Sequence, residues 1–330
     1  MATIKDVAKH AGVSIATVSR VINNRAPISE ATRKNVYEAM ARLNYQPNEM
    51  ARALQKKESH IIGLIVPNIS FPFFAKIANA AAEACHENGY KLMLCKSGKN
   101  GSEEKEMMAM LQANKVDGIL VCSRLGSVSI YRKNHLPIIS IDREIPGIPS
   151  LTCDNLAGGR LAAHTLYQAG CRTPLLLTSA IPDYMSAGLR LKGFCGFFEE
   201  KQITPLTYTL SDDFSSSEYD FDTAEFVAFL DLHKEIDGIF ASSDWLAVNF
   251  MHWLKSSHFC YLKNIPWIGF DGLDSSFLFD LSTIAQPIND MGEMAVELLI
   301  RKINKKAIPD LSILPVQLIE RASTALYSTR

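Results

Sequence analysis

The strongest constraint on the fold is a series of short apolar runs that begins at residue 61. Each run has the length and composition of a buried strand, and segments with helical periodicity separate the runs. Strands that alternate with helices predict a mostly parallel, doubly wound α/β body. The runs are IIGLIVP (61–67), KLMLCKS (91–97), VDGILVCS (116–123), LPIISIDR (136–143), TPLLLTSA (173–180), IDGIFASSD (236–244) and IPWIGFDG (265–272).

Two of these runs resemble each other. VDGILVCS and IDGIFASS share a pattern and lie about 120 residues apart. Such a repeat predicts two similar lobes rather than one continuous sheet. Parallel sheets bind ligands at the carboxyl ends of their strands, so two lobes of this kind leave a ligand-binding cleft between those ends.

The first 46 residues follow a different pattern, which predicts three helices. Thr3, Ser14 and Ser29 can each cap a helix, and Asp6 completes a capping box with Thr3. Gly12 interrupts the pattern between the first two helices. Helix, tight turn and helix form a helix-turn-helix. The expected inward positions are Ile4, Val7, Ala8 and Ala11, then Ile15, Val18 and Ile22, then Val36, Met40 and Leu43.

The charge of the chain is unevenly distributed. Residues 1–60 carry ten Lys or Arg and five Asp or Glu, while the remaining residues carry 24 and 30. A basic head on an acidic body favours a polyanionic partner for the head. The outer face of the second helix presents Thr17, Ser19, Arg20 and Asn23 without an acidic residue. Hydroxyls and amides can bind phosphates, and an arginine can donate two hydrogen bonds to guanine, so this face predicts DNA binding.

The segment YQPNEMARALQKKESH follows the third helix. Pro47 ends that helix, and Asn48 can cap a short helix from Glu49 to Gln55. A helix of this length is unstable alone in water. The segment is therefore either one that orders when a partner holds it or an ordinary flexible linker. The expected domains are 1–46 for DNA binding, 47–59 as hinge helix and linker, and 60–330 for effector binding and dimerisation.

Several other classes of protein are disfavoured. No apolar run is long enough to span a bilayer, and the N-terminus lacks a secretory signal, so we expect a cytoplasmic protein. The seven cysteines are scattered, which predicts buried, reduced thiols and no metal site or cofactor. The sequence lacks GxSxG, P-loop, GxGxxG and HExxH motifs, and its histidines are isolated. We therefore expect that the protein is not an enzyme.

The sequence TIKDVAKHAGVSIATVSRVINN, followed by RKNVYEAMARLNYQPNEMARALQ, resembles the lactose-repressor family of bacterial transcription regulators. The body resembles periplasmic sugar-binding proteins of the ribose type in NISFPFF, SIDRE and STIAQP. The resemblance covers essentially the whole chain. It is strongest to repressors of sucrose and ribose utilisation operons.

This resemblance implies roles for individual residues of the head. Base reading falls to Ile15, Ala16 and Arg20, and phosphate contacts to Thr3, Ser14, Thr17, Ser19 and Asn23. Asn48 begins the hinge helix, and Leu54 matches the leucine inserted into a central base step of the minor groove. Because the family binds DNA as two-fold homodimers, the resemblance implies a near-palindromic operator.

The resemblance also implies an effector site for a sugar or sugar phosphate in the body. Phe73 and Phe74 match aromatics that flank a sugar ring. The expected hydrogen-bonding residues are Asp142, Arg143, Arg190, Asp271 and Gln286. Two positions depart from the ribose-type pattern, because Phe71 and Ser243 stand where that pattern has Asn. The small residue at 243 fits sucrose-type repressors better.

The expected function is repression of a sugar operon, with operator affinity controlled allosterically by a sugar between the lobes. The sequence leaves open whether the sugar releases or tightens DNA binding. Sucrose, fructose, a phosphorylated form of either and ribose are all compatible with the effector-site residues named above. A phosphate group could be bound by Arg124, Arg143, Arg190 and Lys192. The alternatives are a ribose operon repressor, a carbon-catabolite regulator with a phosphocarrier co-repressor, and a transport binding protein.

The terminal LPVQLIERASTALYSTR has no heptad repeat, so we expect a dimer formed through the body, along the helices of the first lobe.

Overall fold

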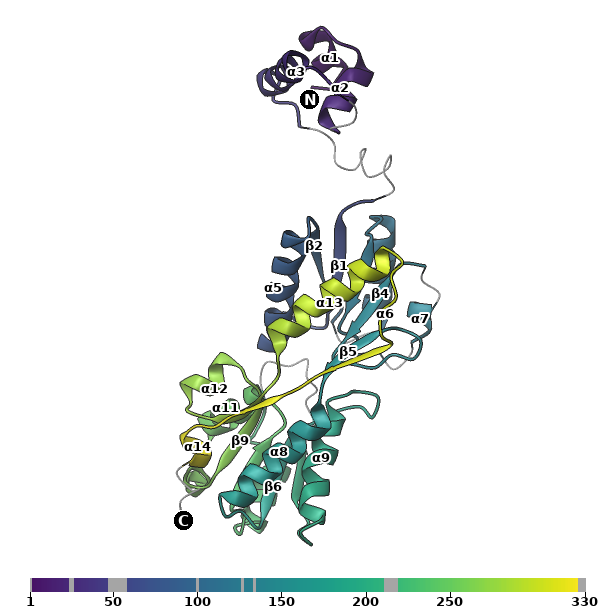
Figure 1. The fold of residues 1–330 in the computed structure, drawn as a ribbon. Coiled ribbons are helices and arrows are strands. Elements are labelled where there is room, and N and C mark those ends of the chain that lie inside the picture. The colour runs from purple at the N-terminus through teal and green to yellow at the C-terminus, as the bar shows by residue number, and fades with distance from the viewer. Residues whose placement is uncertain are drawn as a thin grey trace. The chain divides into compact units, whose positions relative to one another are not determined.

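The computed structural model describes residues 2–23, 27–46, 58–98, 101–125, 128–132, 135–210 and 219–325. The chain divides into two compact units, a head of residues 1–59 and a body of residues 60–330 (Figure 1). Among the described residues, no helix is long and apolar enough to cross a membrane.

The head contains the three predicted helices, α1 (Ile4–Ala11), α2 (Ile15–Ile22) and α3 (Glu30–Arg42). The predicted caps are confirmed. The backbone N–H and the hydroxyl of Thr3 both donate to the Asp6 carboxylate, at 2.8 and 2.7 Å. Ser14 Oγ accepts from the Thr17 N–H at 3.1 Å, and Ser29 caps α3 in the same way.

The core of the head differs from the prediction at one position. Val7, Ala8, Val18, Val21, Val36 and Ala39 are buried together, whereas Ile15 is 44% exposed. Three residues turn an α-helix by about 300°, so Val18 lies about 60° from Ile15 and Val21 about 120°. The buried stripe of α2 is therefore centred on Val18 and Val21, and the prediction that Ile15 faces inward is wrong. Its exposure leaves the side chain available for a partner.

The body contains two six-stranded sheets. The first has the order β11-β5-β4-β3-β1-β2 and is parallel throughout, with Leu64 between Leu94 and Leu120. Its strands are β1 (Ile61–Val66), β2 (Lys91–Lys96), β3 (Gly118–Val121), β4 (Ile138–Ile141), β5 (Ser150–Cys153) and β11 (Leu311–Leu314). Its helices are α5 (Pro72–Glu87), α6 (Gly101–Ala113), α7 (Ser129–Arg132) and α13 (Ile288–Ile303).

The second sheet has the order β12-β10-β9-β8-β6-β7, with β12 antiparallel. Its strands are β6 (Pro174–Ser179), β7 (Leu206–Leu210), β8 (Gly238–Ala241), β9 (Trp267–Asp271), β10 (Ser282–Ala285) and β12 (Gln317–Ile319). Its helices are α8 (Asn155–Gln168), α9 (Gly188–Glu199), α10 (Ala224–Leu232), α11 (Asp244–Trp253), α12 (Asp274–Leu278) and α14 (Ala322–Ala325), with a 3-10 helix at Cys260–Asn264. The two predicted lobes and all seven predicted strands are present.

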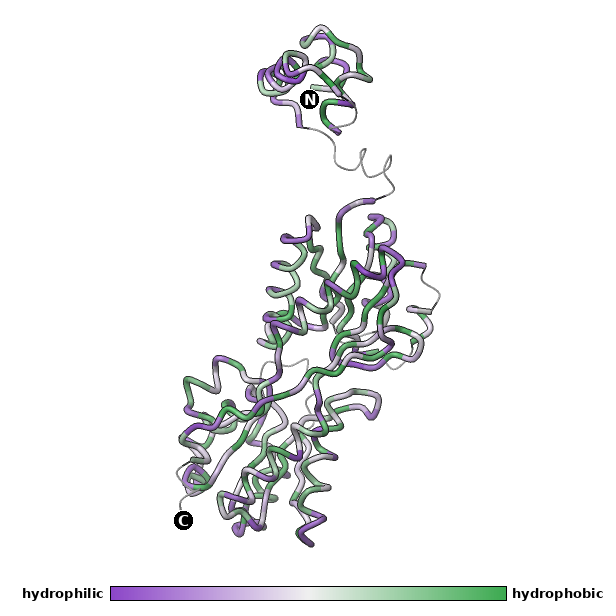
Figure 2. Tube along the Cα trace, in the orientation of Figure 1, coloured by the Kyte–Doolittle hydropathy of each residue, from purple (hydrophilic) through white to green (hydrophobic). Residues whose placement is uncertain are grey.

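The chain passes between the lobes three times, after β5, after β10 and after β11. Because of the second passage, α13 follows a strand of the second lobe yet packs on α5 and β3 of the first (Figure 1). One hydrophobic cluster continues through both lobes, from Ile62 and Phe74 to Phe270 and Ile284. Apolar residues follow the central strands (Figure 2). Five of the seven cysteines are buried as predicted, namely Cys85, Cys95, Cys122, Cys153 and Cys171. The prediction is wrong for Cys195, which is half-buried, and for Cys260, which is exposed.

Candidate functional site

The first candidate site is the outer face of α2. Ser14, Ile15, Ala16 and Arg20 are exposed there, and Thr17, Ser19 and Asn23 are half-buried. Asn23 Nδ2 donates to the Ser19 carbonyl at 2.8 Å, which closes the last turn of α2. Among the described residues, Arg20 has no ion-pair partner, so its guanidinium can meet an external group. The predicted DNA contacts Asn48 and Leu54, with the predicted hinge helix, lie outside the described residues.

The second candidate site lies where strands of the body end. Arg190, in the first turn of α9, is only 3% exposed. Its Nε and Nη2 donate to Asn155 Oδ1 at 3.0 and 2.8 Å. Its Nη1 donates to the Ser242 carbonyl at 2.7 Å and to Asp271 Oδ1 at 3.3 Å. The guanidinium also lies 3.8 Å from the centre of the Phe270 ring. Arg190 is therefore held rigidly at the ends of β8 and β9.

Gln286, directly after β10, joins this arrangement. Its Nε2 donates to Asp271 Oδ1 at 2.7 Å, and its Oε1 accepts from Cys153 Sγ at 3.0 Å. Asp271 has φ 118°, a backbone conformation that side chains rarely adopt and that costs about 1–3 kcal/mol. Burial raises the pKa of Asp271 to about 6, and the charge of Arg190 opposes that rise.

The first lobe contributes Asp142, directly after β4. The Arg124 Nη2 lies 3.9 Å from Asp142 Oδ2, and the Arg124 guanidinium carbon is 5.4 Å from the centre of the Phe74 ring. Burial raises the pKa of Asp142, while Arg124 and then Arg190 of the other lobe lower it. The structure therefore brings five predicted residues to one place, namely Phe74, Asp142, Arg190, Asp271 and Gln286.

Four buried oxygens at this place have no hydrogen-bond partner among the described residues. They are Asp142 Oδ1, Asp271 Oδ2, Ser179 Oγ and Ser242 Oγ. Each follows or ends a different strand, namely β4, β9, β6 and β8. Buried polar atoms are nearly always hydrogen-bonded in native proteins. A set of unsatisfied oxygens at four strand ends therefore suits a ligand that carries several hydroxyl groups.

Arg143 lies differently from its neighbour Asp142. Its Nη1 donates to Ser123 Oγ at 3.2 Å and to the Leu125 carbonyl, both within the first lobe. The other side of its guanidinium faces the Tyr184 ring, 4.3 Å from the ring centre. Arg143 Nε is buried without a partner among the described residues. The Nη1 group of Arg143 therefore stabilises the first lobe, and its Nε is the donor that remains for a ligand.

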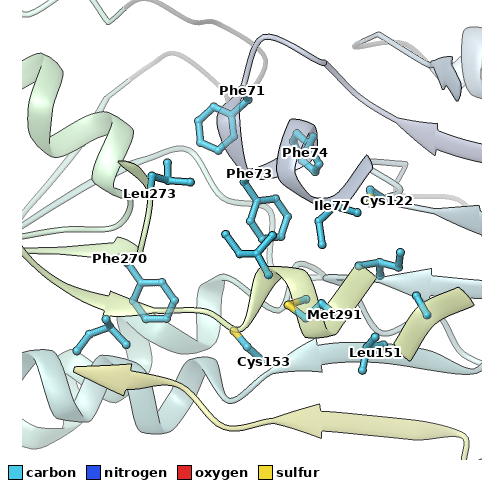
Figure 3. Packing of buried hydrophobic residues seen from close by; sticks show 14 of the residues in the cluster. Phe71, Phe73, Phe74, Ile77, Cys122, Leu151, Cys153, Phe270, Leu273 and Met291 are labelled. Carbon is cyan, nitrogen blue, oxygen red and sulfur yellow. The ribbon is translucent and has the colours of Figure 1, made fainter. Parts of the chain in front are cut away.

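The remaining predicted residues have packing or capping contacts. Ser243 Oγ accepts from the Leu246 N–H at 3.1 Å and caps α11, so a local contact occupies this hydroxyl. Phe71 and Phe73 are buried in the cluster that joins the lobes. Figure 3 shows both rings on the first-lobe side, with Phe270 and Leu273 on the second-lobe side.

The sequence interpretation missed several residues of the cleft, including Asn155, Ser179, Ser242 and Tyr184. Ser179 ends a buried strand and Ser242 follows one, which is the same signal that identified Asp142 and Asp271. Tyr184 lies in the loop between β6 and α9, about which local periodicity says nothing.

A buried carboxyl next to the cleft predicts a pH dependence of stability. Burial raises the pKa of Asp244 from 3.8 to about 8, and the charge of Asp271 adds to the rise. The folded protein therefore binds a proton that the unfolded chain releases above pH 4. The stabilising contribution is complete below the unfolded pKa and is lost as the pH rises through about 8.

The variant Asp244→Asn tests this prediction, because its amide oxygen can still accept the 2.7 Å hydrogen bond from the Leu273 N–H. Between pH 6 and pH 8, wild type should lose more free energy of unfolding than the variant, as measured by urea denaturation. Asp183→Asn, at an exposed carboxyl of the same lobe, is the control and should follow wild type. Parallel pH profiles for wild type and Asp244→Asn would contradict the prediction.

A helix-turn-helix head and a two-lobed body with a polar cleft define a DNA-binding protein that responds to a small polar ligand. Residues 3–48 match the bacterial regulatory proteins of the lacI family. Residues 59–322 match the periplasmic binding proteins and sugar binding domain of LacI family. The chain belongs to the lacI family of bacterial regulatory proteins.

Curated relatives and solved structures agree with this assignment. The sucrose operon repressor of Streptococcus mutans is 36% identical, with 98% of this chain and 99% of that protein covered. The ribose operon repressor of Bacillus subtilis is 34% identical, with the same coverage. The lac repressor dimer bound to operator and the anti-inducer ONPF has a TM-score of 0.85 at 26% identity, covering 98% of this chain and 99% of that one. A LacI-type regulator from Alkaliphilus metalliredigens, complexed with D-xylulofuranose, has a TM-score of 0.71 at 32% identity, covering 80% and 99%.

Family membership confirms several predictions. The protein is a DNA-binding transcriptional repressor that responds to a sugar, and it is not an enzyme. The matched family models assign a regulatory head and a sugar-binding body, and the lac repressor neighbour is a dimer bound to operator DNA. The fold class, a helix-turn-helix head with a two-lobed α/β effector domain, is also confirmed.

Proposed function

We propose that this repressor controls a sugar-utilisation operon, with sucrose or fructose favoured, and that its effector is an unphosphorylated sugar. The four unpartnered oxygens at the strand ends carry this proposal. Sugar hydroxyls can donate hydrogen bonds to the two carboxylate oxygens, whereas phosphate oxygens cannot, and the two serine hydroxyls can pair with either group.

The balance of charge in the cleft supports an uncharged effector. Arg124 and Arg190 are matched by Asp142 and Asp271. Arg143 interacts with the buried Glu104, whose pKa burial raises to about 7 against the lowering effect of Arg143. A phosphate group carries about −1.5 to −2 charges at pH 7 and needs unpaired cations. Arg124 and Arg190 are therefore not available as such cations.

Two observations bear on which sugar binds. Two positions differ from the ribose-type pattern, and one solved relative contains a bound sugar. Phe71 and Ser243 remove two amides that the ribose-type pattern has, which disfavours ribose. The regulator from Alkaliphilus metalliredigens is complexed with D-xylulofuranose, a ketose with a five-membered ring, which supports an effector with such a ring. Fructose and the fructosyl part of sucrose offer such a ring. A ribose operon repressor remains the alternative, because ribose operon repressors are among the relatives.

In the proposed mechanism, residues 1–46 read the operator, residues 47–59 form the hinge, and residues 60–330 bind the sugar and dimerise. In the head, Ile15, Ala16 and Arg20 face the bases, and Leu54 enters the minor groove. Sugar binding between the lobes changes their angle and thereby releases the operator, an allosteric coupling of two sites. The protein acts in the cytoplasm, where the operator is.

The test is fluorescence anisotropy of the full-length protein on labelled DNA from upstream of its own gene. Sucrose, fructose, their phosphates and ribose are added in turn at constant salt, because phosphate contacts make the affinity salt-dependent. We expect sucrose or fructose to weaken binding and the phosphates to have no effect. A response to a sugar phosphate alone would contradict the proposal. Tight DNA binding without any sugar response would favour the carbon-catabolite alternative, with a phosphocarrier protein as the next addition.

A further inference from the structure

Tyr184 connects the two lobes at the edge of the cleft. It belongs to the second lobe, in the loop between β6 and α9. Its hydroxyl donates to the Arg124 carbonyl of the first lobe at 2.9 Å. Its ring faces the guanidinium of Arg143, also in the first lobe, with 4.3 Å between the guanidinium carbon and the ring centre. Both contacts therefore cross from one lobe to the other.

The two arginines that Tyr184 contacts border the effector site. The Arg124 side chain lies beside Asp142 and over the Phe74 ring. Arg143 follows Asp142 in the chain and is anchored on Ser123. A movement that separates the lobes must break both contacts of Tyr184. The contacts thus exist only while the lobes are as close as they are in this structure.

Tyr184 also lines two hollows at the surface of the body. One has a volume of about 630 Å³ and is lined by Arg143, Glu144, Pro146 and Leu311 among others. The other has a volume of about 470 Å³ and is lined by Met185, Leu189 and Lys192 among others. Tyr184 and Glu144 line both hollows. Tyr184 is 41% exposed while Arg143 is 2% exposed, so the ring shields the arginine.

We propose that Tyr184 is a closure contact that retains the effector, by joining the second lobe to Arg124 and Arg143 whenever the lobes are closed. The identity of the sugar rests on the proposed function, but the closure contact does not. Its expected effect is on the rate at which the sugar leaves, because the cleft must open before release. The fold of the second lobe does not depend on the hydroxyl, whose hydrogen-bond partner lies in the other lobe.

The proposal is tested with Tyr184→Phe and Tyr184→Ala in the full-length dimer. The dissociation rates of sucrose and fructose are measured by stopped-flow tryptophan fluorescence. Tyr184→Phe removes one hydrogen bond, which corresponds to release that is about two- to tenfold faster. Tyr184→Ala also removes the contact with Arg143 and should release faster still. Operator affinity without sugar should respond far less than the release rate.

Tyr167→Phe is the matched control. The ring of Tyr167 likewise faces an arginine, with the Arg172 guanidinium carbon 4.0 Å from its centre, but both residues lie within the second lobe. Tyr167 is near the end of α8 opposite to Asn155, about 18 Å along the helix. This variant should release sugar at the wild-type rate. An equal acceleration in Tyr167→Phe and Tyr184→Phe would overturn the proposal.

A ligand-free measurement separates this proposal from the choice of sugar. If wild type binds neither sucrose nor fructose, the proposed effector is wrong, and hydrogen–deuterium exchange of the free protein then tests the contact. Tyr184→Ala should increase exchange in peptides that cover residues 119–125 and 180–190, on both edges of the cleft. Unchanged exchange at both edges, or unchanged sugar release in both Tyr184 variants, would overturn the closure contact.

Discussion

Replacing Arg190 with alanine should abolish the sugar response while operator binding persists. The side chain is buried and donates to Asn155, Ser242 and Asp271. Its removal takes away the predicted effector contact and leaves the carboxylate of Asp271 buried without its cation. Breaking a buried ion pair in this way costs about 3–5 kcal/mol. We therefore expect urea denaturation to show a large loss of stability in the body, and anisotropy to show operator binding that sucrose and fructose no longer change.

Two further variants make the result specific. Arg190→Lys keeps the positive charge but not the forked geometry, so it should lose the sugar response with a smaller loss of stability. Arg160→Ala breaks an exposed ion pair with Glu200 in the same lobe, which solvent screens, and should behave as wild type. A normal sugar response in Arg190→Lys and Arg190→Ala would place the effector elsewhere.

Replacing Arg20 with alanine should remove the discrimination between operator and random DNA. Arg20 is exposed on α2, among short side chains that let a DNA backbone approach. A forked contact with guanine contributes about 1–3 kcal/mol of discrimination, and a dimer makes it twice. The expected loss of specificity is therefore about 2–6 kcal/mol, measured as the ratio of operator and random-DNA affinities at one salt concentration.

Arg42→Ala is the matched control for this experiment. Arg42 is also exposed, in the last turn of α3, and its removal takes the same charge from the head. Both variants should weaken binding to random DNA similarly, whereas only Arg20→Ala should lose specificity. Both should retain the sugar binding of the body. If Arg20→Ala still prefers the operator by the wild-type ratio, another residue reads the bases.

The sequence predicted those parts of the fold that depend on local patterns. The caps at Thr3, Ser14 and Ser29 and the seven apolar strands are local, and all are present. Five strands were not predicted. β5 and β10 are only four residues long and contain two polar residues each. β7, β11 and β12 lie at the edges of the sheets and leave alternate residues exposed. The partner strand that orders each of them is distant in sequence.

In the candidate site, too, residues that follow a local pattern could be predicted, whereas those that depend on distant contacts could not. Asp142 and Asp271 could be predicted because each ends an apolar strand. The direction of Arg143 could not, since Ser123 lies 20 residues away and Tyr184 lies in the other lobe. Nor could the inward position of Val21 instead of Ile15, because the centre of a buried stripe depends on the helices that pack against it.

The three passages of the chain between the lobes have a consequence for biosynthesis. The ribosome synthesises the head first. The first lobe is complete only after α13 and β11 have been synthesised, and both follow strands β6 to β10 of the second lobe in the sequence. A nascent chain therefore carries a complete reading head long before it carries a complete sensor.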